Sequence, residues 1–174
     1  MGRVLYRCKD FYVEEYACKI NGRTRVLQRI IEPDIVVVLP FLDRDTVLLE
    51  KQYRHPIGKW LYELPAGHID KGESAMAAAR RELKEETGYA AGIVRKMFSA
   101  YSNPGLNTAV RNYFYAAGLK QGNRHLEPTE EIRTEKVKFS WLSTLIKNNS
   151  IVDEKTIAAV SYYKEYVKTK RAHV

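Results

Sequence analysis

One stretch of the chain, residues 67–89, constrains the fold and its chemistry more than any other. Three carboxylates, those of Glu82, Glu85 and Glu86, fall within five residues, shortly after a glycine-rich turn. If residues 74–87 are helical, these side chains are i, i+3 and i, i+4 neighbours on one helical surface, where like charges destabilise an isolated helix. Magnesium, a hard cation that takes oxygen ligands, would offset the repulsion. The pattern therefore predicts a helix that carries a magnesium site.

Two other interpretations of the same stretch are weaker. The segment 81–86 taken alone has the composition of an ordinary solvated helix face, since charged residues mostly lie outside. The upstream Gly67 and Glu73 argue against that interpretation. Gly67 and Gly72 also have the glycine spacing of a phosphate-binding P-loop. They are followed by Glu73 and Ser74 where such a loop needs Lys and then Ser or Thr, so a P-loop is excluded.

Composition limits the class of protein. The 174 residues predict one domain, and 45% hydrophobic residues suffice for a core. The net charge of +8 attracts polyanions. The basic residues are nevertheless spread along the chain, apart from a cluster at 164–171, so specific nucleic-acid binding is not predicted. No apolar run approaches the ~18–20 residues of a membrane span. Two isolated cysteines, Cys8 and Cys18, and no leader-like N-terminus predict a cytoplasmic protein.

Hydrophobic periodicity predicts an α/β fold, a sandwich with a mixed sheet and flanking helices, preceded by an antiparallel β segment at residues 1–32. The catalytic domain is expected at 33–174. Turn-rich or polar loops are expected at 102–108 and 120–134, and helices at 74–87, 142–149 and 155–171. Strands are expected at 3–7, 11–20, 24–31, 35–42, 46–54, 92–101, 110–119 and 137–142.

The stretch at 67–89 resembles the Nudix box, G-x5-E-x7-R-E-U-x-E-E-x-G-U, where U is a bulky aliphatic residue. Leu83 fits the first U, whereas Tyr89 at the second is bulky but not aliphatic. Chance agreement at all seven fixed positions has odds of roughly one in 10⁸ per frame. Those seven positions are filled by Gly67, Glu73, Arg81, Glu82, Glu85, Glu86 and Gly88.

Three features outside the box resemble the ADP-ribose pyrophosphatase branch of the Nudix family. They are Gln52-Tyr53-Arg54 on the preceding strand, the segment 63–67 that opens the box, and Pro104, fifteen residues after Tyr89. The resemblance covers about residues 10–170. It implies a Nudix α/β/α sandwich and a homodimer in which the N-terminal strands are swapped between subunits.

The resemblance also assigns residues. It implies two or three Mg²⁺ ions, replaceable by Mn²⁺, held by Glu82, Glu85, Glu86 and the carbonyl of Ala66, with Arg81 orienting the box glutamates. Glu73 is interpreted as structural. Glu130 and Glu131, in the polar loop before the last predicted strand, are candidates for the general base, with Glu131 slightly preferred and Glu85 as an alternative. Substrate contacts are expected from Arg54, whose planar fork suits phosphate oxygens, and from Tyr53, Pro104 and Gly105.

The activity implied is magnesium-dependent hydrolysis of the pyrophosphate bond of ADP-ribose to AMP and ribose 5-phosphate. Another nucleoside diphosphate sugar, such as GDP-mannose, or an oxidised nucleotide remains an alternative substrate. A non-catalytic nucleotide-sensing module is a further alternative, although an intact box argues against it. RNA cap removal would suit the basic charge but has no supporting motif. The sequence leaves base and sugar specificity open.

Overall fold

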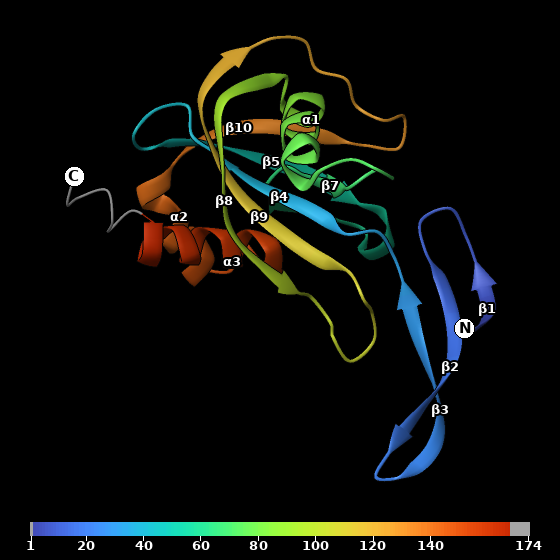
Figure 1. Ribbon diagram of the computed structural model, residues 1–174. Helices are drawn as coiled ribbons and strands as arrows, with labels where there is room; N and C mark the ends of the chain where they lie inside the picture. The colour runs from blue at the N-terminus through green and yellow to red at the C-terminus, as the bar shows by residue number, and fades with distance from the viewer. Residues whose placement is uncertain (1, 168–174) are drawn as a thin grey trace.

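The computed structural model describes residues 2–167, which form ten strands and three α-helices. Figure 1 shows their arrangement. Two short helices complete the set, a 3₁₀ turn at His55–Ile57 and a π-helical turn at Tyr163–Val167. The α-helices are α1 (Ala75–Thr87), α2 (Phe139–Lys147) and α3 (Glu154–Tyr162). The strands are β1 (Arg3–Arg7), β2 (Tyr12–Ile20), β3 (Arg23–Ile31), β4 (Ile35–Pro40), β5 (Thr46–Arg54), β6 (Lys59–Glu63), β7 (Ala66–His68), β8 (Tyr89–Tyr101), β9 (Val110–Gln121) and β10 (Ile132–Lys138).

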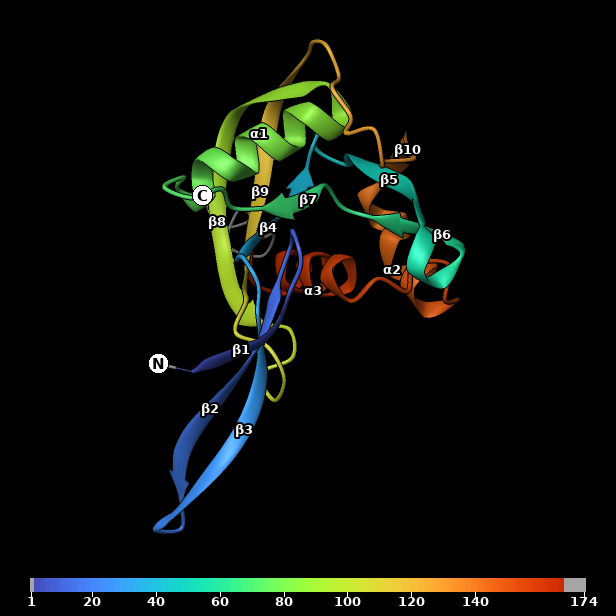
Figure 2. The same ribbon diagram turned by 90° about the vertical axis from the view of Figure 1, so that its right-hand side faces the viewer.

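A four-stranded sheet in the order β7-β4-β9-β8 forms the centre of the molecule. Strands β4 and β9 are parallel, whereas β7 and β8 are antiparallel to their neighbours, so the sheet is mixed. Helix α1 covers one face, and α2 and α3 lie on the other (Figure 2). The predicted α/β/α sandwich is therefore confirmed.

Strand β4 shows why both faces need cover. Its residues Val36, Val37, Val38 and Leu39 are completely buried, the pattern of a strand packed on both sides. Val36 and Val38 pack with α1, while Val37 and Leu39 join the core of α2 and α3. This buried centre fixes the strand ends from which the polar residues described below emerge.

A second sheet, in the order β10-β5-β6, places polar residues beside the central one. In register across it, Glu50 of β5 lies opposite Glu63 of β6 and opposite Thr134 of β10. Glu50 and Glu63 are both almost completely buried. Two buried carboxylates side by side are costly unless they are paired or protonated, so this sheet contributes to a polar site as well as to the core.

The N-terminal strands β1, β2 and β3 form a separate antiparallel sheet that projects away from the sandwich (Figures 1 and 2). The three predicted N-terminal strands are confirmed, with Asn21 and Gly22 at positive φ in the hairpin turn. The sheet exposes large apolar side chains to solvent, namely Val4, Leu5, Tyr6, Phe11, Ile20, Val26 and Leu27.

Two predictions near the C-terminus were wrong. The loop predicted at 120–134 is shorter because β10 begins at Ile132, and the strand predicted at 137–142 is the end of β10 followed by α2. Helix α2 begins without a side-chain cap from Lys138, its N-cap residue. Distant Asp45 caps it instead. Its carbonyl accepts from the N–H of Phe139 at 2.6 Å, and its carboxylate accepts from Ser140. A local pattern cannot reveal a cap supplied from the distant turn before β5.

The helix predicted at 155–171 exists as α3 and the π turn through Val167, and residues 168–171 lie outside the described residues. The basic cluster predicted at 164–171 likewise falls mostly outside them. None of the helices in the described part of the chain combines the length and apolar character needed to cross a membrane.

Candidate active site

A cleft of about 1070 Å³ opens beside α1 and the start of β4, a size suited to a small ligand. One wall comes from α1 and β7, another from the β1–β2 turn, and a third from the loop before β10. Charged side chains of both signs face it. The charged lining residues are Lys9, Asp10, Glu32, Arg54, Asp70, Lys71, Arg81, Glu82, Glu85, Arg111, Glu127, Glu130 and Lys155.

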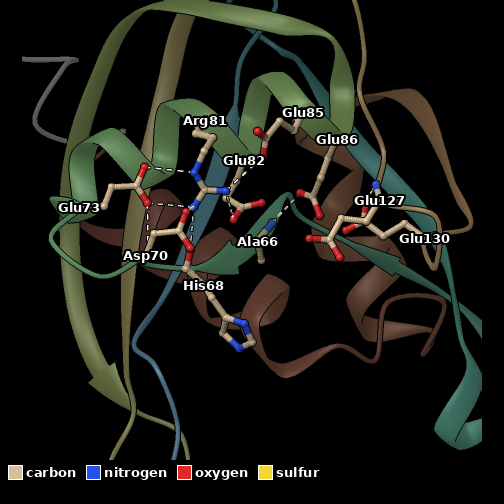
Figure 3. A network of polar contacts seen from close by, with 10 residues as sticks. All are labelled: Ala66, His68, Asp70, Glu73, Arg81, Glu82, Glu85, Glu86, Glu127 and Glu130. Atoms are coloured by element: carbon tan, nitrogen blue, oxygen red, sulfur yellow. Dashed lines mark hydrogen bonds and ion pairs between the residues drawn. The ribbon is translucent and has the colours of Figure 1, made fainter. Parts of the chain in front are cut away.

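Helix α1 positions the predicted carboxylates through local sequence signals. The hydroxyl of Ser74 accepts a hydrogen bond from the N–H of Ala77, capping the helix start, and Gly88 ends it in the left-handed conformation at φ 79°. The apolar face of α1 packs onto the central sheet. The opposite turn of the helix then presents Glu82, Glu85 and Glu86 along one side (Figure 3).

Arg81 is the centre of the hydrogen-bond network in Figure 3. Its guanidinium donates to Glu73 at 3.1 and 2.9 Å, to Glu82 at 2.7 Å, to Glu85 at 3.1 Å and to the carbonyl of His68 at 2.8 Å. The hydrogen bonds with Glu73 contribute most to raising the pKa of Arg81, and they lower the pKa of Glu73. Arg81 therefore connects Glu73 to the box carboxylates Glu82 and Glu85. The orienting role that the resemblance implies for Arg81 stays a prediction.

Gly67 leaves room for the carboxylate of Glu82. A β-carbon at Gly67 would collide with the Glu82 carboxyl group. On the neighbouring residue, the N–H of Ala66 donates to Glu86 at 2.9 Å. The backbone of β7 thus passes directly against two of the predicted metal ligands, which explains the fixed glycine of the motif.

The carboxylates around α1 carry more negative charge than their surroundings neutralise. Burial raises the pKa of Glu82 to about 7, with Glu85 and Glu130 adding repulsion against the opposing effect of Arg81. Burial also raises the pKa of Glu86 well above its usual value, and Glu50 and Glu82 raise it further. Oxygen donors with uncompensated charge suit a hard divalent cation. As the side chains stand, no three His, Cys, Asp or Glu groups within residues 2–167 are gathered tightly enough to enclose an ion.

Arg54 lines the cleft, and its guanidinium is held by a buried acid. It donates to Glu63 from Nε at 2.7 Å and from Nη2 at 2.6 Å, and Lys155 donates to the same carboxylate at 3.0 Å. Burial alone would raise the pKa of Glu63, but these cations lower it. Lys155 also pairs with Asp153 at 2.5 Å. Two cations from outside α1, Arg54 and Lys155, thus line the cleft together with the acidic residues of that helix.

The loop before β10 separates the two candidate bases. Glu130 lines the cleft, and its charge is close enough to raise the pKa values of Glu82 and Glu86. Its carboxylate accepts from the N–H of Glu127 at 2.8 Å. Glu131 lies instead beside His55, with Nε2 and Oε1 3.2 Å apart. The geometry therefore favours Glu130 over Glu131, against the slight preference drawn from the sequence.

The other predicted substrate contacts do not line the cleft of the single chain. Tyr53 packs against Trp60 and His55, with ring centroids 5.5 and 4.9 Å apart. Pro104 and Gly105 lie in the exposed turn before β9, whose flanking residues Ser102 and Ala109 reach the cleft. These three contacts remain predictions.

Sequence reasoning missed three residues of this region. Glu50 is buried, its Oε1 has no hydrogen-bond partner among the described residues, and burial raises its pKa to about 8. A charged residue directly after the apolar run of 47–49 was the available signal. Arg111 and Lys155 reach the cleft from β9 and α3. No spacing in the sequence connects them to the box.

Comparison with known proteins agrees with this geometry. The family model of the NUDIX domain matches residues 32–159. An ADP-ribose pyrophosphatase of Bacillus subtilis is 32% identical over 155 residues, covering 88% of this chain and 83% of the relative. A methanol dehydrogenase activator of Bacillus methanolicus is 31% identical over 144 residues, covering 82% of this chain and 78% of that protein.

A solved structure shares the fold over nearly all of the chain. The crystal structure of an ADP compounds hydrolase superimposes with a TM-score of 0.84 at 24% identity, covering 97% of this chain and 95% of that one. At this identity the likeness establishes the architecture, including the projecting N-terminal strands within the covered length.

Proposed function

Because the chain belongs to the NUDIX family, we propose that it is a magnesium-dependent hydrolase that splits the pyrophosphate bond of ADP-ribose into AMP and ribose 5-phosphate. The observation that carries the proposal is the box helix, whose carboxylates Glu82 and Glu85 line a ligand-sized cleft that cations from other elements also line, with the buried Glu86 on the same helix. The Bacillus subtilis ADP-ribose pyrophosphatase supports the choice of substrate.

Glu82, Glu85 and Glu86 would hold the metal, together with the Ala66 carbonyl. The fit rests on the raised pKa values of Glu82 and Glu86 and on the space that Gly67 leaves beside Glu82. Two or three Mg²⁺ ions, replaceable by Mn²⁺, are proposed. When bound, Mg²⁺ supplies positive charge to the phosphoryl oxygens and lowers the pKa of an attacking water.

The side chains of the cleft have separate tasks in this reaction. Arg81 orients Glu82 and Glu85 through its two short contacts. Glu130 is proposed as the general base because it lines the cleft without being held by Arg81. Its carboxylate would take the proton of the attacking water, a role typically worth 10²–10⁴-fold in rate. Arg54, steadied by Glu63, would contact a substrate phosphate.

A homodimer is proposed from the N-terminal sheet. A small exposed sheet is marginally stable alone, and β1, β2, β3 and the β1–β2 turn together present seven large apolar side chains to solvent. The β1–β2 turn also brings Lys9 and Asp10 to the cleft. A second subunit that covers this sheet would therefore both bury apolar surface and fix one wall of the site. The two free cysteines, Cys8 and Cys18, support a reducing, cytoplasmic setting.

A hydrolysis panel tests the substrate. ADP-ribose, GDP-mannose, UDP-glucose, NADH and 8-oxo-dGTP are incubated with the protein and Mg²⁺, and the products are identified. We expect the highest kcat/KM for ADP-ribose, with AMP and ribose 5-phosphate as products. A preference for GDP-mannose would favour another nucleoside diphosphate sugar as the substrate. A preference for 8-oxo-dGTP would favour an oxidised nucleotide as the substrate. No turnover of any compound would favour the non-catalytic nucleotide-sensing module.

A further inference from the structure

Three cations from elements other than α1 line the cleft, namely Arg54, Arg111 and Lys155. They are not equally free to bind a ligand. Arg54 and Lys155 share the carboxylate of Glu63, which is 1% exposed, through three contacts of 2.6–3.0 Å. Moving either cation away would leave a buried charge less well paired, which is costly.

Arg111 differs in both its partner and its hydrogen bonding. It lies near the start of β9, in register with Ile35 of β4, so the central sheet fixes its backbone. Its Nη1 lies 3.2 Å from Glu154 Oε1, and the Glu154 side chain is 69% exposed. Ion pairs with an exposed partner are weak. The contact is not aligned as a hydrogen bond. Arg111 also interacts with the hydroxyl of Tyr113, where it opposes the rise that burial causes in the pKa of that group, but the buried Nη1 itself has no hydrogen-bond partner among residues 2–167.

We propose that Arg111 binds the phosphoryl group of the substrate that is remote from the box carboxylates. This inference rests on the proposed function, because it takes a nucleoside diphosphate linked to a sugar as the ligand. The carboxylates of α1 repel a phosphate unless cations are bound between them, whereas Arg111 can bind a phosphate directly through its planar donor fork. The buried, unsatisfied Nη1 would gain an acceptor, and Glu154 would be released to water.

The arrangement gives each part of the diphosphate a different partner. The phosphate nearer α1 lies on the side of Glu82, Glu85 and Glu86, and the other lies on the side of Arg111. Lys155 and Arg54 add positive potential to the same wall while keeping their contacts with Glu63. Removing Arg111 should therefore weaken substrate binding more than it slows the chemical step.

The test measures binding apart from turnover. Inorganic pyrophosphate and ADP-ribose are titrated calorimetrically into the protein with EDTA present, and KM and kcat for ADP-ribose are measured with Mg²⁺. For Arg111→Met we expect both dissociation constants and KM to rise about tenfold or more, with kcat within about threefold of the wild-type value. Arg111→Lys should recover part of the loss. Arg133→Met is the matched control, because Arg133 lies over the ring of Trp60, 5.0 Å from its centroid, and does not line the cleft.

The opposing variant keeps the inference testable if Arg111→Met does not fold. Glu154→Gln removes the rival of Arg111 and should tighten pyrophosphate binding about twofold or more. Unchanged pyrophosphate affinity in folded Arg111→Met overturns the inference. If Arg111→Met is unfolded, unchanged pyrophosphate affinity in Glu154→Gln overturns it. A loss of affinity in Arg133→Met equal to that in Arg111→Met also overturns it. If pyrophosphate binding depends on Arg111 but ADP-ribose is not hydrolysed, the inference stands and the proposed substrate is wrong.

Discussion

Replacing Glu50 by Gln should stabilise the protein, and the gain should grow with pH. Glu50 is 1% exposed, lies opposite the carboxylate of Glu63 in register, and has an oxygen without a hydrogen-bond partner among the described residues. Burial raises its pKa from 4.5 to about 8; Arg124 opposes the rise, and Glu63 adds to it. The folded state thus prefers the protonated carboxyl group, which glutamine imitates at every pH.

The size of the gain follows from linkage between proton binding and folding. Below pH 4.5 Glu50 is protonated in both states and costs nothing. Above that value the unfolded chain releases the proton while the folded chain retains it, so stability falls by about 1.4 kcal/mol per pH unit until the folded pKa is reached. The cost is then about 3 kcal/mol at pH 7 and at most about 5 kcal/mol above pH 8.

Chemical denaturation measures the gain directly. Wild type and Glu50→Gln are unfolded in urea at pH 5, 7 and 8.5, with EDTA present and at one protein concentration, using the fluorescence of Trp60 and Trp141. The difference in free energy of unfolding should be below about 1 kcal/mol at pH 5 and rise to several kcal/mol at pH 8.5. Glu154→Gln, which changes a carboxylate that is 69% exposed, is the control and should show less than about 1 kcal/mol throughout. A pH-independent difference, or a destabilised variant at pH 8.5, would refute the reasoning.

Other predictions concern catalysis and assembly. Glu82→Gln and Glu86→Gln should each lower kcat by orders of magnitude while leaving the circular dichroism spectrum unchanged; near wild-type turnover in a folded variant would remove the metal assignment. Glu130→Gln should lose at least ~10²-fold in kcat with Mg²⁺ affinity little changed, whereas Glu131→Gln, whose carboxylate contacts His55, should lose less; the reverse order would return the base to Glu131, and full activity in both would direct attention to Glu85. Deleting residues 1–32 should convert a homodimer into a monomer with little activity, as light scattering and turnover would show, and a fully active 20 kDa full-length monomer would contradict this.

The sequence predicted the box helix well because its determinants are local. The capping hydroxyl of Ser74, the left-handed Gly88 and the spacing of the glutamates all lie within fifteen residues of one another. Arg81 reaches Glu85 by i, i+4 helical geometry, and it reaches Glu73 in the turn just before the N-cap. For such a segment the pattern of residues fixes the three-dimensional arrangement, and only the partners from other strands are missing.

The remaining features depend on residues that meet only in the folded chain. Helix α2 begins at Phe139 because Asp45, far away in sequence, accepts hydrogen bonds from its first turn. Arg111 and Lys155 come from β9 and α3, and sequence spacing says nothing of how these elements approach the box. Glu50 was visible as a charge in an apolar strand, but its proximity to Glu63 required the register of β5 with β6.

The net charge of the whole chain and the local charge of the cleft favour different ligands. A net charge of +8 favours polyanions in general, yet the cleft wall formed by α1 is acidic, and burial raises the pKa values of Glu82 and Glu86. A nucleic-acid backbone laid against that wall would meet repulsion. Under the proposed function, a short diphosphate would instead place one phosphate near cations held by the carboxylates and the other near Arg111. We therefore expect the cleft to bind a small ligand with two adjacent phosphates, and added salt should weaken its metal-free binding through Arg111 while leaving the acidic wall unfavourable for longer polyanions.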